Sequence, residues 1–178
     1  MFDNIRADFQ RYMRANAGYS SISSTIYSLI SYGFIATCVY RYGRWTRRIH
    51  PRLISYPFKF VYILLQLVID ILFGINISTN VDIGPGLYIG HFGGIFLHGD
   101  MGKNCSVTQG VTVGYKGGGK STHPPRIGDN VYIGACAVVI GDISIGDNAV
   151  IGANTTVVRD VPANCTVVSA EPRVLRRA

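Results

Sequence analysis

An aliphatic residue or methionine returns every six positions along most of this chain. A helix requires a period near 3.6 and a simple strand a period of 2. A period of six instead indicates short strands joined by tight corners, three of which make one triangular coil. The repeat positions are Ile77, Ile83, Ile89, Ile95, Met101, Val107 and Val113, then Ile127, Ile133, Val139, Ile145, Ile151 and Val157.

Stacked coils of this kind form a column in which strands pair at a spacing of about 4.8 Å. Gly follows most of the repeat positions, and "IGDN" occurs at 127–130 and again at 145–148. Gly and Asn suit corners that need a positive φ or a cramped turn. A β-sandwich of ordinary hairpins does not hold a six-residue phase for this long. We therefore predict a mainly β fold, a parallel β-helix of about five coils, with a helical N-terminal region.

The repeat is interrupted between Val113 and Ile127, where the chain is about eight residues longer than one step requires. The segment "GYKGGGKSTHPPR" at 114–126 must leave the column as a loop. Loops on rigid scaffolds often carry functional groups. We predict three parts: a helical region at 1–76, the β-helix at 77–168 with its inserted loop, and a tail at 169–178.

The N-terminal region is basic and apolar. Residues 1–76 carry nine Lys or Arg and three Asp, whereas the rest of the chain is close to neutral. Two apolar segments of helical length flank the arginines at 41–52. Helices lying on an anionic membrane surface would explain both features. The alternative is that these helices pack on the column or on sister subunits. Nucleic acid is not expected, because the arginines lie among apolar segments.

Four widely spaced cysteines show no metal-binding or disulfide pattern. They are Cys38, Cys105, Cys136 and Cys165, with no CxxC pair and no histidine at zinc-ligand spacing. The polar start of the chain lacks the apolar core of a signal peptide. We expect reduced cysteines, no metal and a cytoplasmic protein, with a peripheral position on the inner face of the cell membrane if the helices bind there.

Histidines are the main candidates for chemistry, because the inward positions of the coils are aliphatic. His91 follows Ile89 by two residues and lies outside the inward register. His123 lies in the inserted loop, which could fold over the coil that carries His91. His98 and His50 complete the set. For any one histidine a structural role is the simpler interpretation, but His91 and His123 together favour a site.

Several motifs resemble one enzyme family. "GLYIGHFGGI", "SVTQGVTVG", "HPPRIGDNVYIGACAVVIGDISIGDNAVIGANTTVVRDVP" and "EPRV" occur in order over residues 74–175. They are similar to the serine O-acetyltransferase branch of the left-handed β-helix acyltransferases. This resemblance implies a left-handed coil, acetyl-CoA as cosubstrate, and a homotrimer with sites between neighbouring columns.

The resemblance also implies roles for particular residues. His91 takes the position of the general base that removes the acceptor's hydroxyl proton, and His123 that of the second active-site histidine. Asn76 stands where the family has the carboxylate that orients the base; Asp82 and Asp100 are the alternative acids. For acetyl-CoA, the resemblance implies contacts from Tyr115, Lys116, Ala135 and Ala153. By their charge alone, Lys120, Arg126 and Arg173 are further candidates for contacts to the phosphates of coenzyme A.

Two further departures bear on the acceptor. Gly90 replaces the Asp that precedes the base, and Thr122 replaces the Arg that precedes the second histidine. Both charges suit a free amino acid. Their loss, with a likeness of "GLYIGHFGG" to a branch that serves capsule and exopolysaccharide assembly, favours a sugar hydroxyl or lipid-linked glycan as acceptor. The alternatives are L-serine, in cysteine biosynthesis, and a catalytically inactive trimeric scaffold.

Overall fold

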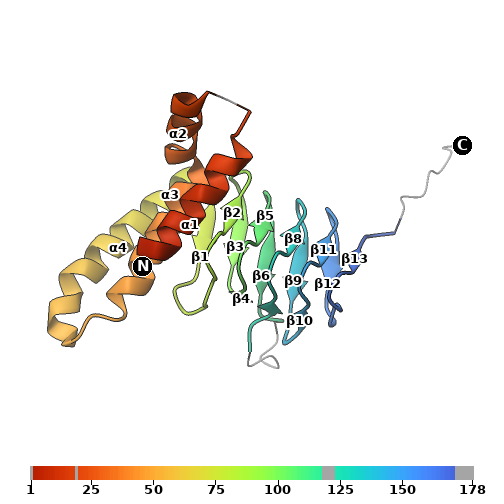
Figure 1. Ribbon diagram of the computed structural model, residues 1–178. Coiled ribbons are helices and arrows are strands. Elements are labelled where there is room, and N and C mark those ends of the chain that lie inside the picture. Colours follow the sequence, from red (N-terminus) through yellow and green to blue (C-terminus); the bar gives the residue numbers. More distant parts are fainter. Residues whose placement is uncertain (1, 19, 118–122, 171–178) are drawn as a thin grey trace, which may run out of the picture.

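The computed structural model describes residues 2–18, 20–117 and 123–170, which form a layer of four helices and a column of short parallel strands (Figure 1). The helices are α1 (Phe2–Ala15), α2 (Ser21–Leu29), α3 (Tyr32–Thr46) and α4 (Arg52–Phe73). The helices lie at the N-terminal end of the column, and the chain then runs away from them coil by coil (Figure 1). The predicted combination of a β-helix and a helical N-terminal region is confirmed.

The column has three faces, which we name after the first strand of each. The β1 face holds β1 (Ile75–Ile77), β3 (Ile95–Leu97), β6 (Thr112–Gly114), β9 (Val138–Ile140) and β12 (Thr156–Val157). The β2 face holds β2 (Tyr88–Ile89), β5 (Ser106–Val107), β8 (Tyr132–Ile133), β11 (Val150–Ile151) and β13 (Thr166–Val167). The β4 face holds β4 (Asp100–Met101), β7 (Arg126–Ile127) and β10 (Ser144–Ile145). Five strands on two faces agree with about five coils.

The residues at the six-residue repeat positions form the core of the column. All thirteen residues of the six-residue repeat are buried, with exposures between 0% and 5%. Strands pair in parallel with the strand one coil later, as Ile89 does with Val107 and Ile133 with Ile151. A side chain at each phase position therefore stacks on its equivalent in the next coil, which fills the interior without polar groups.

The corners use asparagine as the sequence predicts. Asn130 and Asn148, the last residues of the two "IGDN" motifs, have φ of 58° and 57°. Asparagine tolerates this left-handed conformation better than other residues with a side chain. The side-chain amide of Asn130 donates to Asn148 Oδ1 at 3.2 Å, and that of Asn148 donates to Asn164 Oδ1 at 3.0 Å. This ladder holds one edge of the column in register.

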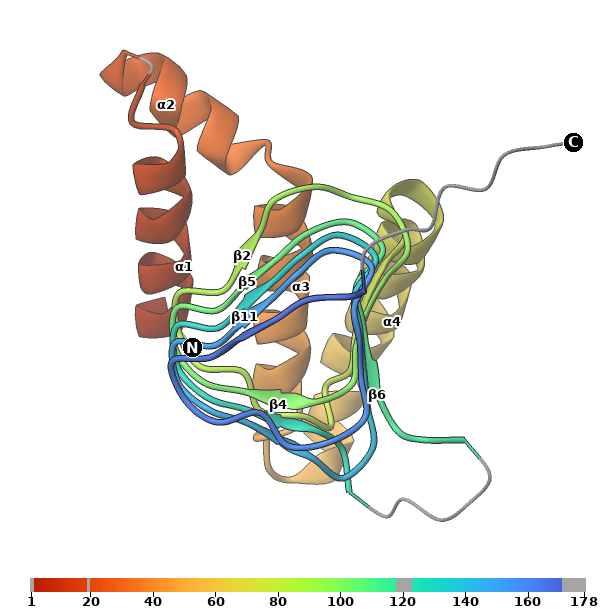
Figure 2. The same ribbon diagram turned by 90° about the vertical axis from the view of Figure 1, so that its right-hand side faces the viewer.

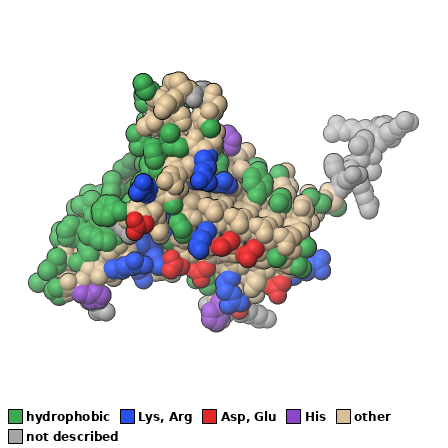
Figure 3. Space-filling model, viewed as in Figure 1, with side chains coloured by type: hydrophobic (Ala, Val, Ile, Leu, Met, Phe, Trp, Pro, Cys, Tyr) green, Lys and Arg blue, Asp and Glu red, His purple; other side chains and the backbone are tan. Residues whose placement is uncertain are grey.

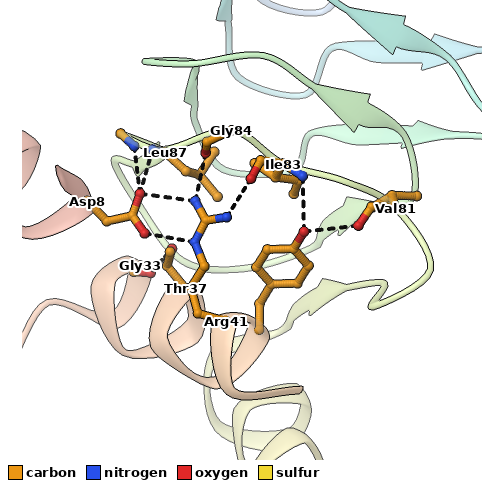
Figure 4. A network of polar contacts seen from close by, with 10 residues as sticks. Asp8, Gly33, Thr37, Arg41, Val81, Ile83, Gly84 and Leu87 are labelled. Carbon is orange, nitrogen blue, oxygen red and sulfur yellow. Dashed lines mark hydrogen bonds and ion pairs between the residues drawn. The ribbon is translucent and has the colours of Figure 1, made fainter. Parts of the chain in front are cut away.

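Helices α1 and α3 cover the open end of the first coil with a buried ion pair. Asp8 on α1 and Arg41 on α3 are 0% and 4% exposed, with Nε to Oδ2 at 2.9 Å (Figure 4). Asp8 Oδ1 also accepts from the backbone N–H groups of Gly86 and Leu87, at 2.7 and 3.0 Å. Arg41 donates to the carbonyl of Gly84 at 2.7 Å. The pair therefore satisfies backbone groups that would otherwise be an unpaired sheet edge.

Two buried tyrosines extend this cover. The Tyr40 hydroxyl donates to the Val81 carbonyl and accepts from the Ile83 N–H, both at 3.0 Å (Figure 4). The Tyr12 hydroxyl accepts from the Ile89 N–H at 2.9 Å. Burial raises the pKa of both phenols, so they stay neutral donors and acceptors. Gly33 lets α3 approach this coil, because a Cβ there would lie 2.4 Å from the Ile89 carbonyl oxygen.

Three arginines of the basic N-terminal region bind partners within the protein rather than facing a membrane surface. Arg41 is buried in the ion pair, and Arg44 Nη2 lies 2.9 Å from Asp82 Oδ2. Arg47 donates to Asn80 Oδ1 at 2.8 Å. Helices α1 and α3 pack on the column, which is the alternative to membrane contact that the sequence left open.

Helix α4 packs on α3 and β1 along one side and leaves the rest of its surface apolar and exposed (Figure 3). Residues Leu53–Phe73 are long and apolar enough to cross a membrane by length and composition, and most of their side chains are exposed. Helices α2 and α3 would pass the same criterion only if taken together, and they are bent by 55° at the break between them. Contact of this region with an anionic membrane surface stays a prediction.

Candidate functional site

His91 lies on the edge of the column where the chain passes from the β2 face to the β1 face. We call this the His91 edge; it comprises residues 90–94, 108–111, 134–137 and 152–155. The side chain of His91 is exposed. Within the described part of the chain its ring makes no recorded hydrogen bond or ion pair. His91 is therefore not a satisfied core histidine, and its ring is open to a ligand or to another subunit.

The corner that carries His91 is fixed to the helical layer. Gly93 donates its N–H to the Phe73 carbonyl at 2.9 Å, and Ile95 donates to the Gly74 carbonyl at 2.9 Å. Phe92 packs its ring on Tyr32, with centroids 4.7 Å apart. Gly93 itself has a φ of 100°, which a residue with a side chain rarely adopts. The chain thus holds His91 on a rigid corner while leaving its ring free.

Asn76 forms hydrogen bonds with His98 and Asp70, and not with His91, the expected base. Its Oδ1 atom is 2.8 Å from His98 Nε2, and its Nδ2 atom donates to both carboxylate oxygens of Asp70 at 3.2 Å. Asn76 pairs across the sheet with Phe96, so His98 is its diagonal neighbour. The structure therefore places Asn76 with His98 rather than His91.

The two alternative acids are also engaged elsewhere. Asp82 forms its ion pair with Arg44. Asp100 Oδ1 accepts from the N–H of Asp82 at 2.7 Å, on the β4 side of the column. Neither carboxylate lies on the His91 edge, so neither orients His91 in this chain.

His123 lies on a different edge of the column from His91. We call this second edge, between the β1 and β4 faces, the loop edge, because the inserted loop leaves the column there (Figure 2). His123 Nδ1 is 3.5 Å from Asp142 Oδ2, and Arg126 Nη2 is 3.6 Å from Asp142 Oδ1. The expectation that this loop folds over the coil carrying His91 is therefore wrong within one chain.

The residues predicted to bind acetyl-CoA divide between the same two edges. Ala135 and Ala153 lie one above the other on the His91 edge, where the Ala135 carbonyl accepts from the Asn154 N–H at 2.8 Å. Tyr115, Lys116 and Arg126 are exposed at the loop edge. Lys120 and Arg173 lie outside the described residues, as does Thr122. Small residues beside His91 leave the backbone accessible to an extended ligand.

Two side chains that sequence reasoning did not assign complete the surroundings of Asn76. They are Asp70, near the end of α4, and His98, after β3. Together with Gly74, Gly94 and Phe96, Asp70 and Asn76 line a hollow of about 300 Å³. One signal was present in the sequence, because Asp70 is the one acidic residue of the largely apolar segment at 52–73. A charge in such a segment is costly and is often functional.

The thiols and the other hollows offer less. Burial raises the pKa of Cys38 and of Cys105 to about 11, so both remain protonated and unreactive at neutral pH. A hollow of about 760 Å³ at the far end of the column, against Val157 and Val161, contains none of the predicted site residues. In the described residues no three His, Cys, Asp or Glu side chains gather as metal ligands.

Comparisons with known proteins agree on one family. A family described as "Bacterial transferase hexapeptide (six repeats)" matches residues 124–159. The serine acetyltransferase of Synechococcus elongatus is 32% identical over 185 residues, covering all of this chain and 70% of that protein. Serine acetyltransferase 2 of Arabidopsis thaliana is 30% identical over 175 residues, which cover 97% of this chain but only 51% of the plant protein.

Solved structures of the same kind share the fold. The Neisseria gonorrhoeae serine acetyltransferase in complex with serine has a TM-score of 0.75 at 32% identity, covering 96% of this chain and 68% of that chain. The Brucella abortus enzyme in complex with coenzyme A has a TM-score of 0.74 at 27% identity, covering 95% and 65%. The β-helix of these neighbours is left-handed, and so is the present column.

Proposed function

Because the chain belongs to the serine acetyltransferase family of hexapeptide-repeat transferases, we propose that it transfers the acetyl group of acetyl-CoA to the hydroxyl oxygen of L-serine. It is an acetyltransferase by this membership. The observation that supports the reaction best is the placement of His91. Its ring is free, its corner is fixed, and Ala135 and Ala153 continue the same edge.

The expectation of a sugar or lipid-linked glycan as acceptor is wrong. Serine acetyltransferases, and no glycan-modifying enzymes, are named among the relatives and structures above. The charges missing at Gly90 and Thr122 do not exclude serine, since a binding site can draw its charges from other positions. L-Serine, the alternative, is the acceptor favoured by these relatives.

The reaction requires a base, an electrophile and a leaving thiol. In our proposal His91 removes the hydroxyl proton of serine as its oxygen attacks the thioester carbonyl, which gives a tetrahedral oxyanion. The carbon–sulfur bond then breaks, and the imidazolium returns a proton to the sulfur of coenzyme A. Backbone N–H groups along the edge stabilise the oxyanion. Atoms balance without a covalent enzyme intermediate.

A homotrimer would bring the two halves of the predicted site together. His91, Ala135 and Ala153 lie on one edge of the column, while His123, Tyr115, Lys116 and Arg126 lie on another. In a cyclic trimer the same two surfaces of neighbouring chains meet three times. We propose that acetyl-CoA lies between the His91 edge of one column and the loop edge of its neighbour.

Alkylation of Cys136 tests the position of acetyl-CoA. Cys136 is exposed on the His91 edge, next to Ala135, with a φ of 57°. We expect N-ethylmaleimide to modify Cys136 first, and saturating acetyl-CoA to slow this modification at least about tenfold. Peptide mapping by mass spectrometry measures both rates. Cys165, half-buried directly before β13 and outside the His91 edge, is the internal control and should react at the same rate with and without the ligand.

The activity itself is tested by release of coenzyme A thiol from acetyl-CoA by the purified full chain. We expect release to depend on added L-serine and to saturate with it. Release at the same slow rate with and without L-serine would oppose the proposal.

A further inference from the structure

The hollow on the β1 face adjoins the corner that carries His91. It measures about 300 Å³ and is lined by Asp70, Gly74, Asn76, Gly94 and Phe96. Gly94 ends the corner that begins at Gly90, so the hollow and His91 share one short segment of backbone. A volume of this size accommodates a small amino acid. Three of the five lining residues come from the end of α4 and the first strand, and of these only Asn76 belonged to the sequence-based assignment of the site.

Asp70 brings an uncompensated negative charge to this hollow. Its Oδ1 atom accepts from Gln66 Nε2 at 2.8 Å, and both of its oxygens accept from Asn76 Nδ2 at 3.2 Å. These donors are neutral amides. In the described part of the chain no Lys, Arg or His forms an ion pair with Asp70. A half-buried carboxylate without a cation is a ready acceptor for a cationic ligand.

The surrounding amides hold this carboxylate in place. Asn76 has a fixed orientation, because its NH₂ group must face Asp70 and its oxygen then faces His98 Nε2, which donates. Gln66 is fixed in the same way, since its oxygen accepts from the Tyr62 hydroxyl at 3.3 Å while its NH₂ group donates to Asp70. The chain Tyr62–Gln66–Asp70–Asn76–His98 is thus a preorganised support for one charge.

We infer that Asp70 binds the ammonium group of the amino-acid acceptor in this hollow. The inference rests on the proposed function and assigns the substrate contact that Gly90 does not supply. With its ammonium on Asp70, a short amino acid extends its hydroxyl toward the corner of His91. His98 and Asn76 are positioning residues in this arrangement, since they act through Asp70.

Substitution of Asp70 tests the inference. Asp70→Asn keeps the shape and removes the charge, and loss of a charge-assisted contact should raise KM for L-serine roughly 10- to 100-fold. KM for acetyl-CoA and the midpoint of thermal unfolding should stay within the range of the wild type. Asp70→Glu keeps the charge and should retain part of the affinity. Asp3→Asn, at an exposed carboxylate in the first turn of α1, is the matched control.

Two measurements separate the inference from the proposed function. Calorimetric titration of L-serine without acetyl-CoA should show binding to the wild type and weakened binding to Asp70→Asn. The wild type should also prefer L-serine to 3-hydroxypropanoate, which lacks the ammonium, and Asp70→Asn should lose most of this preference. Serine turnover by the wild type with an unchanged KM in Asp70→Asn overturns the inference alone. Absence of both serine binding and serine turnover in the wild type overturns the inference and the proposed function together.

Discussion

Replacement of His91 by Ala lowers kcat for acetyl transfer by a factor of roughly 10² to 10⁴, the usual contribution of a general base. The fold should be unaffected, because the ring is exposed and, in the described part of the chain, forms no recorded hydrogen bond or ion pair. KM for acetyl-CoA should change little, since Ala135 and Ala153 contact the ligand in our proposal and His91 acts on the acceptor. Steady-state assays with purified protein measure these constants.

His50→Ala is the matched control for this prediction. His50 is another exposed histidine, whose Nδ1 lies 3.0 Å from the Arg48 carbonyl oxygen, far in sequence from the column. Its substitution should leave kcat near the wild-type value. Equal activity of His91→Ala and wild type would remove His91 from the reaction.

Mixing inactive chains extends the same test to the shared site. If His123 also serves the reaction, His91→Ala and His123→Ala chains unfolded and refolded together form some sites with both histidines intact. Random assembly into trimers predicts recovery of about a quarter of the wild-type activity. Recovery requires the two edges to come from different chains, so a lack of recovery would contradict the arrangement proposed between neighbouring columns.

Replacement of Asp8 by Asn lowers the free energy of unfolding by about 3–5 kcal/mol, because it leaves a buried guanidinium without its counter-charge. Arg41 is 4% exposed and Asp8 is fully buried, so water cannot take the place of the lost carboxylate. The substitution also weakens the contacts to the N–H groups of Gly86 and Leu87 at the open end of the first coil. Equilibrium unfolding in urea, followed by circular dichroism, measures the change.

Two further variants place this loss at the ion pair. Asp3→Asn lies on the same helix but is exposed, and it should change stability by no more than about 0.5 kcal/mol. The double variant Asp8→Asn, Arg41→Gln removes both charges but keeps amide groups for the backbone partners, and it should be more stable than Asp8→Asn alone, since no unpaired charge is left buried. A loss below about 1 kcal/mol in Asp8→Asn would mean that the pair does not hold the helices on the column.

The column could be predicted from the sequence because its signal is local and repeated. Each phase position, such as Ile133 or Val139, needs only its own coil to be assigned to the interior, and every one of them is buried. The same holds for the corners, where Asn130 and Asn148 adopt the expected positive φ. Repetition makes up for the weak information in any single six-residue step.

Contacts across coils and between helices could not be predicted in the same way. Asn76 was assigned to His91 by counting along the chain, but its neighbours are set by the pairing of β1 with β3, which places His98 diagonally opposite. The pair Asp8–Arg41 joins two helices that pack on each other and on the first coils of the column. Such contacts depend on tertiary packing, which a single sequence does not display.

The positions of His91 and His123 on the edges of the column could be predicted only in part from the sequence. The six-residue phase places His91 and His123 at different corners, because His91 follows a strand of the β2 face and His123 precedes one of the β4 face. This was available from the sequence once each strand is assigned to its face. The Gly-rich composition of the loop suggested that it folds over the coil carrying His91 in the same chain. In the structure His123 instead lies beside Asp142, on the loop edge.

The most direct test of the account is the identity of the acetylated product. The purified full chain is incubated with acetyl-CoA labelled in the acetyl group and with L-serine, and the products are separated and identified by mass spectrometry. We expect labelled O-acetylserine in amounts equal to the coenzyme A released, and almost none with the His91→Ala variant. Coenzyme A release without labelled O-acetylserine, or equal product from His91→Ala, would contradict it.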